Sequence, residues 1–175
     1  MNRKVVLYIA MSLDGYIADK NGELDFLSIV HKEGEDYGYF EFINSIDTVL
    51  IGRKTFDWIL SHAEVYPHLD KKTYVITRQQ LKERENIQFY NGDIQSLISK
   101  LKSEKGNNIF CDGGAELVNL LLRNKLIDEM IISVIPIILG GGIKLFDDNI
   151  LFQNLSLISS KPFESGLVQL HYNIA

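Results

Sequence analysis

The 175-residue sequence has one cysteine, three prolines and no long apolar run. The single cysteine, Cys111, excludes an intramolecular disulfide and a zinc site built from several thiolates. A membrane-spanning helix would need roughly 20 consecutive apolar residues. The net charge of −5 disfavours a nucleic-acid-binding protein, which normally presents a basic face. We therefore expect a cytoplasmic protein that binds a small molecule, with neither a nucleic acid nor a membrane as its partner.

Several established motifs are missing as well. The segment 140–145 has leucine in place of the last glycine of a dinucleotide-binding GxGxxG motif. Residues 52–55 resemble the end of a phosphate-binding loop without its upstream glycine, which disfavours a phosphotransferase. The four histidines lack the spacing of metal ligands, and no serine lies in a GxSxG context. The sequence therefore predicts neither a metal site nor a serine hydrolase.

What the sequence does contain is an alternation of apolar runs with amphipathic stretches, which is typical of an α/β sheet. Two alternating segments around Ser165 and Gly166 predict a C-terminal antiparallel hairpin. Without an internal repeat or linker, residues 1–175 are expected to form a single domain. We predict a loop at 12–22, strands at 5–11, 48–51, 73–77, 108–111 and 130–139, and helices near 36–46, 55–60, 94–101 and 115–122.

Three predicted strands end in residues that suit a phosphate group. Residues 52–55 supply a glycine, two cations and a hydroxyl, residues 77–78 supply a hydroxyl and a guanidinium, and residues 112–114 lead through two glycines into a helix. The start of a helix presents unpaired N–H groups and partial positive charge to an anion. Each feature alone is more often an ordinary turn. Because ligands of open α/β sheets bind at the carboxyl ends of strands, we expect the three sets to converge.

In their order and spacing, these segments resemble the dihydrofolate reductase superfamily, and specifically the reductase domain that ends the bifunctional riboflavin-biosynthesis deaminase/reductase. The resemblance runs from about residue 5 to residue 146. It implies a mostly parallel central sheet flanked by helices, and an NADPH site. The segments that carry it are 12–18 (SLDGYIA), 51–55 (IGRKT), 77–78 (TR), 112–115 (DGGA), 126–129 (LIDE) and 136–140 (PIILG).

The resemblance also implies a cofactor role for individual residues. Ala10 and Ile17 would flank the nicotinamide. Arg53, Thr77 and Arg78 would meet the adenosine ribose and its 2′-phosphate, and arginine pairs well with a dianionic phosphate, which NADH lacks. NADPH is therefore favoured over NADH. The residues expected to cradle the pyrophosphate are Gly52, Arg53, Lys54, Thr55, Gly113, Gly114, Ala115 and Glu116.

Reduction of a C=N or C=O bond consumes a proton as well as a hydride. Asp112 is one candidate donor, since it stands where the riboflavin reductases tend to carry a glutamate, and a helix-capping role explains it equally well. Asp14 is the other, although the glycine after it favours a turn. Asp25, Phe26 and Ser133 are candidate substrate contacts.

The chain departs from the riboflavin reductases where they would hold a substrate phosphate. Tyr16 stands in place of a lysine, and the segments 40–44 and 64–67 lack the expected arginine and Asp-x-Pro. We therefore predict an NADPH-dependent reductase of a small heterocycle that is pteridine-like, dihydrofolate-like or pyrimidine-like. The alternative is a module that binds NADP(H) and has lost catalysis. The β-rich C-terminal region offers edges that a second copy could cover, so a homodimer is possible.

Overall fold

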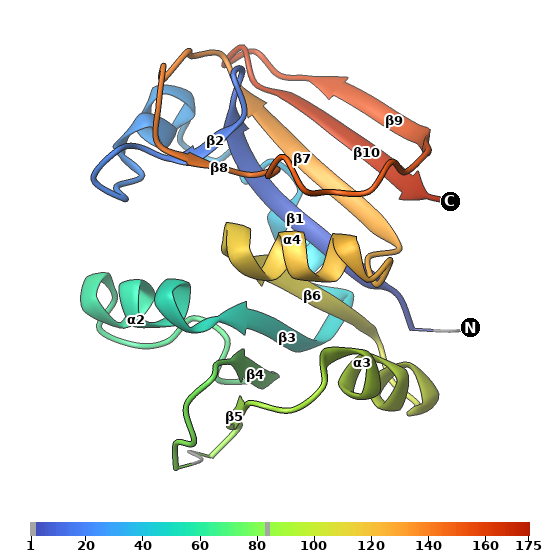
Figure 1. The fold of residues 1–175 in the computed structure, drawn as a ribbon. Helices are drawn as coiled ribbons and strands as arrows, with labels where there is room; N and C mark the ends of the chain where they lie inside the picture. The colour runs from blue at the N-terminus through green and yellow to red at the C-terminus, as the bar shows by residue number, and fades with distance from the viewer. Residues whose placement is uncertain (1–2, 83–84) are drawn as a thin grey trace.

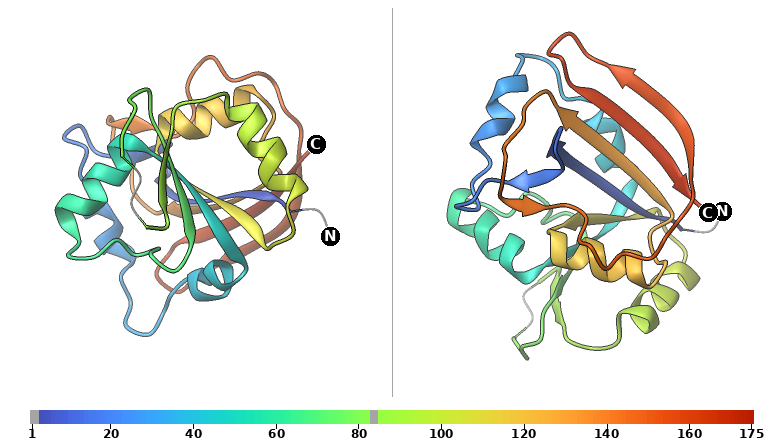
Figure 2. Two further views of the ribbon diagram at one scale, coloured as in Figure 1. Left: turned by 90° about the horizontal axis from the view of Figure 1, so that it is seen from below. Right: turned by 45° about the horizontal axis from the view of Figure 1, so that its top comes forward.

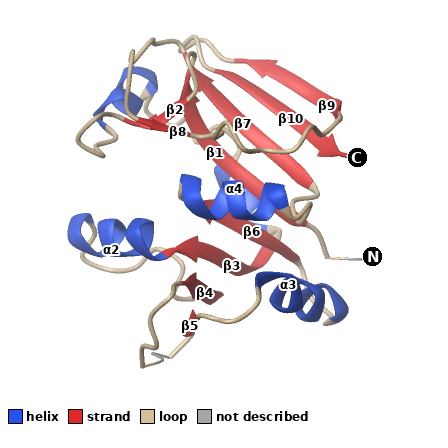
Figure 3. Cartoon of the chain, in the orientation of Figure 1, coloured by secondary structure: helices blue, strands red, loops and turns tan. Residues whose placement is uncertain are grey.

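The computed structural model describes residues 3–82 and 85–175 and contains an eight-stranded sheet in the order β5-β4-β3-β6-β1-β7-β10-β9 (Figures 1 and 3). A small second sheet pairs β2 with β8. The strands are β1 (Val5–Ser12), β2 (Tyr16–Ala18), β3 (Ile46–Gly52), β4 (Lys72–Ile76), β5 (Ile87–Tyr90), β6 (Asn108–Gly113), β7 (Glu129–Ile135), β8 (Ile143–Lys144), β9 (Leu155–Pro162) and β10 (Val168–Ile174). The helices are the 3₁₀ helix η1 (Asp25–Val30) and the α-helices α1 (Tyr39–Asn44), α2 (Arg53–His62), α3 (Ile94–Ser103) and α4 (Ala115–Arg123).

The six strands from β5 to β7 run parallel to one another, whereas β10 is antiparallel to both of its neighbours, β7 and β9. The predicted mostly parallel sheet and C-terminal hairpin are thereby confirmed. In the parallel part, Ile51 of β3 is paired with Gly113 of β6, and Gly52 with Ile76 of β4. The ends of these three strands therefore lie side by side.

Helices cover both faces of the sheet, which explains why its central strands are apolar on both sides (Figure 2). On one face, α3 and α4 bury their apolar stripes against alternate residues of the central strands, such as Leu7 and Cys111. On the other face, α1 packs Phe42 against Val6 and Phe110, while α2 packs its own apolar residues against β3 and β4. Neighbouring residues of β6 therefore face different layers.

The element boundaries differ from the sequence predictions in a few places, each for a local reason. The helix predicted over 36–46 begins only at Tyr39, because the Asp36 carboxylate accepts the amides of Gly38 and Phe40 in a turn. The predicted loop at 12–22 contains β2, which is a strand only because it pairs with β8. Such pairing comes from a distant segment, so the local sequence does not signal it.

The hairpin strand β9 is the outer edge of the sheet, and all eight of its residues are exposed. Within the described residues, no helix is both long and apolar enough to cross a membrane.

Candidate functional site

The site lies at the carboxyl ends of β3, β6 and β4, where α2 and α4 begin close together. A side chain on Gly52 would place its Cβ 3.5 Å from the backbone oxygen of Gly113 and 3.5 Å from the nitrogen of Gly114. A Cβ on Gly114 would lie 2.6 Å from the Thr55 hydroxyl, so that position has no room for one. The glycines therefore bring two helix N-termini together, and both direct N–H groups and partial positive charge to one place.

Charged side chains join the two helix starts. Lys54 of α2 donates to the Glu116 carboxylate of α4 at 2.6 Å, and both side chains are exposed. The hydrogen bond from Lys54 holds the pKa of Glu116 below its usual value, and the Arg78 guanidinium adds to this effect. Arg78 is thus close enough to act electrostatically on the α4 start. Thr77 extends the end of β4, where its amide donates to the Tyr90 carbonyl at 3.0 Å.

The predicted cofactor residues 52–55, 77–78 and 113–116 are therefore gathered at one edge of the sheet. Thr55 does not cap α2, because the residue in the N-cap position is Gly52 and no side chain caps the helix. Its hydroxyl instead points to Gly114 across the junction. Ala115 is the first residue of α4. Each of these positions can present either a backbone amide or a side-chain donor to a phosphate.

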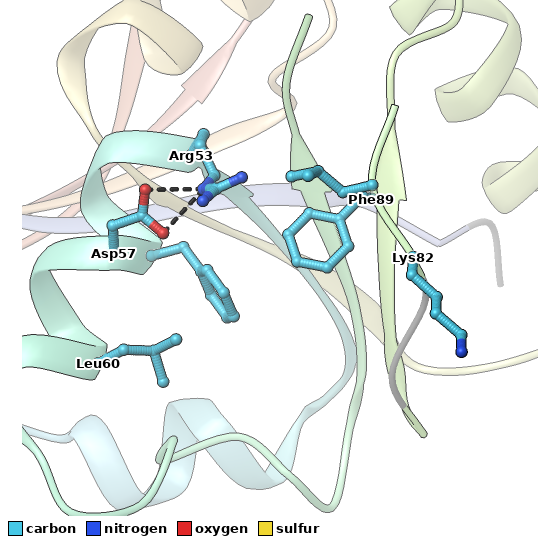
Figure 4. A pocket seen from close by; sticks show the side chains of 7 residues that line it. Arg53, Asp57, Leu60, Lys82 and Phe89 are labelled. Atoms are coloured by element: carbon cyan, nitrogen blue, oxygen red, sulfur yellow. Dashed lines mark hydrogen bonds and ion pairs between the residues drawn. The ribbon is translucent and has the colours of Figure 1, made fainter. Parts of the chain in front are cut away.

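Arg53 projects from this edge toward β5 (Figure 4). Its Nε is 2.7 Å from both carboxylate oxygens of Asp57, one helical turn on, and its guanidinium carbon lies 5.6 Å from the centre of the Phe89 ring. Together these groups line a pocket of about 380 Å³ that Leu60 and Lys82 also border. One terminal nitrogen, Nη1, is buried with no hydrogen-bond partner among residues 3–82 and 85–175. That nitrogen is a donor which a phosphate oxygen would satisfy.

The two residues expected beside the nicotinamide lie near the end of β1. Ala10 is half-buried in a cluster with Phe26 of η1 and Ile135 of β7. Ile17, in β2, packs against the larger cluster on the other face of the sheet. The structure therefore places them on either side of the strand end.

Asp112 does not cap α4, although its position before two glycines allowed that role. The N-cap of α4 is Gly114, and no side chain makes a capping hydrogen bond there. Asp112 instead points to the α1 face of β6, where its Oδ2 atom lies 3.7 Å from Nε2 of His68. His68 belongs to the loop between α2 and β4, and its side chain is 5% exposed. A role for Asp112 as the N-cap of α4 is thereby excluded.

Two tyrosines complete the surroundings of Asp112. Burial, and to a smaller extent the nearby Asp112 carboxylate, raises the pKa of Tyr39 to about 12. Burial raises the pKa of Tyr66 as well, again with a contribution from Asp112. Both phenols are therefore protonated at neutral pH and can donate hydrogen bonds. The result is a carboxylate with an imidazole 3.7 Å away and two protonated phenols near enough to feel its charge.

Asp14, the other candidate proton donor, holds a loop together. Its carboxylate accepts the Ser12 hydroxyl at 2.6 Å and the amides of Leu139 and Gly140 at 3.0 and 2.7 Å. The hydrogen bond from Ser12 is the main reason that its pKa is lowered, and the two amides contribute. A carboxylate held in its ionised form is poorly suited to donating a proton. These contacts favour a structural role for Asp14.

The predicted substrate residues are more dispersed. Asp25 begins η1 and is exposed, whereas Phe26 is 8% exposed and belongs to the core under that helix. Ser133 of β7 is 4% exposed, and its hydroxyl accepts a hydrogen bond from Gln169 at 3.2 Å. Gln169 also donates to the Tyr37 carbonyl, so Ser133 belongs to a buried polar network. Of the three residues, only Asp25 is freely accessible.

The site also contains residues that the sequence prediction did not assign. His68 and Tyr66 lie in an irregular segment between α2 and β4, with no motif around them. Their position over Asp112 depends on how that loop folds back onto the sheet. Only Tyr39 carried a signal, through the helical spacing of the aromatic residues around it.

A parallel sheet with paired helix starts at its carboxyl edge and an antiparallel hairpin at its end is the architecture of the dihydrofolate reductase class. Dihydrofolate reductase from Enterococcus faecalis, solved as a complex with NADP(H), superposes with a TM-score of 0.69 over 99% of both chains, at 15% identity. At that identity the likeness concerns the fold alone.

Within this class the chain belongs to the RibD C-terminal domain family, which residues 3–169 match. It is 44% identical over 173 residues to the uncharacterized protein YwjB of Bacillus subtilis (strain 168), with 98% of each chain covered. A putative riboflavin biosynthesis protein from Shewanella sp. PV-4 superposes with a TM-score of 0.90 at 30% identity, over 98% of this chain and 99% of that one. The suspected family is confirmed, and with it the reductase fold.

Proposed function

We propose that the protein is an NADPH-dependent reductase of a small heterocyclic substrate, pteridine-like, dihydrofolate-like or pyrimidine-like. The observation that carries the proposal is the glycine-lined junction of α2 and α4, where a Cβ on Gly114 would meet Thr55 at 2.6 Å. Close backbone approach at two helix N-termini is what a pyrophosphate requires. The RibD C-terminal domain family and the fold support the same class of activity.

The residues present fit this cofactor. Arg53 offers a buried nitrogen that has no partner among the described residues, and Arg78 lies near the α4 start, so two guanidinium groups are available for a 2′-phosphate. NADPH, when bound, supplies the hydride of the reduction. The chain then has to position the substrate on the α1 face and provide a proton. Asp112 is the candidate donor, because it lies one residue before the glycine junction and points to that face.

The direct test is to titrate the protein with NADPH and with NADH and to measure both affinities by calorimetry. We expect NADPH to bind more tightly, and equal or undetectable binding of the two would contradict the proposal. Oxidation of NADPH is then followed at 340 nm with dihydrofolate, dihydropterins and aminouracils. Tight binding without any oxidation across this panel would favour the non-catalytic module instead.

A further inference from the structure

The loop between α2 and β4 buries a histidine directly against the candidate proton donor. The side chain of His68 is 5% exposed and that of Asp112 is 19% exposed, with 3.7 Å between Nε2 and Oδ2. This distance is too long for a hydrogen bond and short enough for an ion pair. Oδ2 itself is buried and lacks a hydrogen-bond partner within the described chain. A buried carboxylate oxygen without a donor is costly, and His68 is the group placed to satisfy it.

Packing holds the imidazole in this place. The His68 ring lies edge-to-face against Tyr66, with 5.5 Å between ring centres, and against Phe110, with 5.9 Å. Phe110 precedes the carboxylate on β6 by two residues, so both partners of the His68–Asp112 pair are fixed to the same strand. The two ring contacts therefore hold the imidazole beside the carboxylate.

We propose that His68 is a positioning residue, which orients the Asp112 carboxylate and supplies it with the proton for each reduction. The proposal rests on the proposed function. In the reduction, the carbon of a C=N bond takes the hydride of NADPH, which becomes NADP⁺, and the nitrogen takes a proton from the Asp112 carboxyl. The Asp112 carboxyl obtains this proton from the His68 imidazolium of the resting ion pair, and the imidazole, left neutral, is reprotonated from solvent.

Within the described residues, titratable groups from β6, from α1 and from the loop of His68 itself lie around the pair. Asp112 faces it from β6, and Tyr66 lies beside it on the same loop. Asp70, two residues on, is close enough for His68 to lower its pKa, although the hydrogen bond from Lys71 is the larger cause. Tyr39 of α1 acts on the pair through Asp112. Of these groups, the Asp112 carboxylate is the one whose oxygen lies 3.7 Å from the imidazole nitrogen, within ion-pair distance.

The first test needs no substrate. Protein labelled with ¹⁵N-histidine is titrated from pH 5 to 9 by long-range ¹H–¹⁵N spectra, as wild type and as Asp112→Asn, and His68→Phe assigns the signals. Replacing the carboxylate by a neutral amide removes the negative charge that faces the imidazole, so we expect the Nε2 signal of His68 to move in Asp112→Asn. The exposed His62 serves as the internal control. A His68 Nε2 signal that is the same in both proteins across this pH range would overturn the pairing.

The second test separates positioning from packing. His68→Phe keeps the edge-to-face contacts and removes the nitrogen, while His68→Gln keeps an N–H donor that cannot relay a proton. We expect both variants to bind NADPH as the wild type does. With the substrate found by the panel, we expect His68→Phe to lower kcat about tenfold or more and to change its pH profile, and His68→Gln to recover part of kcat. His62→Phe, at a histidine that also stacks on an aromatic ring, is the matched control.

The two proposals fail in different ways. Loss of the proposed function shows as absent NADPH binding in the wild type, and the titration then still decides whether the His68–Asp112 pair exists. An unchanged kcat and pH profile in His68→Phe, with a wild type that oxidises NADPH, would overturn the role of His68 alone.

Discussion

Asp112 and Gly113 are consecutive residues of β6, yet the region around Gly113 is built mainly from backbone groups and the region around Asp112 mainly from side chains. The region beyond Gly113 consists of glycines, helix starts and exposed cations, so it offers a ligand mainly backbone N–H groups and positive charge. The region around Asp112 consists of side chains, with a buried imidazole and two phenols near one carboxylate. A strand directs successive residues to opposite faces, so one strand end can serve both regions. We therefore expect substitutions in the glycine region to change NADPH affinity and substitutions around Asp112 to change turnover.

The largest effect is expected for Asp112→Asn. Removing a proton donor typically lowers turnover by about 10²- to 10⁴-fold. The affinity for NADPH is expected to stay unchanged, because the side chain faces away from α4. Stopped-flow measurement of NADPH oxidation and a fluorescence titration provide the two numbers. Asp70→Asn, at an exposed neighbour of His68, is the control. If Asp112→Asn lowered turnover and NADPH affinity in parallel, the two regions would not have separate roles.

Gly113→Ala tests the backbone region. Gly113 has a φ of +93°, where a residue with a side chain is strained by about 1–3 kcal/mol. Because that strain moves the backbone of the junction, we expect NADPH to bind about tenfold or more weakly, in line with about 1.4 kcal/mol per tenfold. Gly34→Ala carries a similar φ of +79° in a loop with nothing within 4 Å of the added Cβ. It is expected to lower the melting temperature without changing the NADPH affinity, and equal losses of affinity in the two variants would contradict the assignment.

Arg78→Ala tests the 2′-phosphate contact by comparing the affinities for NADPH and NADH. A charged hydrogen bond contributes about 1.5–3 kcal/mol, so we expect NADPH affinity to fall about tenfold to a hundredfold while NADH affinity changes little. Calorimetry with both nucleotides measures this. Arg123→Ala, near the far end of α4 and paired with Asp147, should leave both affinities as they are. A matched loss for NADPH and NADH would rule out contact with the 2′-phosphate.

Lys54→Met gives the smallest effect. The pair of Lys54 with Glu116 is solvent-exposed, so its loss is expected to change the free energy of unfolding by less than about 1 kcal/mol. Lys54 lowers the pKa of Glu116 in the folded state, so the contribution is present above the ordinary glutamate pKa of about 4.3 and is lost as the pH falls. Urea unfolding of both proteins at pH 7 and pH 3.5 tests the sign. A difference that grows in acid would contradict it.

The sequence predicted the backbone region far better than the side-chain region. Strand ends followed by glycine and a helix start are local features, and parallel strands necessarily bring them to one edge. The segment with His68 has no comparable pattern. Its place over β6 depends on a contact with Phe110, which is distant in the sequence, and on a contact with Tyr66, which lies in the same irregular loop. Asp112 shows the limit most clearly. Its sequence context fits a helix cap and a proton donor equally, and only its orientation in the fold excludes the cap.

Asp14, in the loop after β1, accepts hydrogen bonds from the amides of Leu139 and Gly140, in the segment after β7. It thereby connects two segments that lie about 125 residues apart in the sequence. This connection depends on an ionised carboxylate, and its lowered pKa keeps it intact well into mild acid. Stronger acid protonates the carboxylate and releases the two amides, while the hydrogen bonds between the strands contain no titratable group. Strong acid is therefore expected to break the contact between the Asp14 loop and the segment after β7 before it affects the hydrogen bonds of the main sheet. In hydrogen exchange, we expect the amides of Leu139 and Gly140 to lose protection at a higher pH than those of β1 and β6.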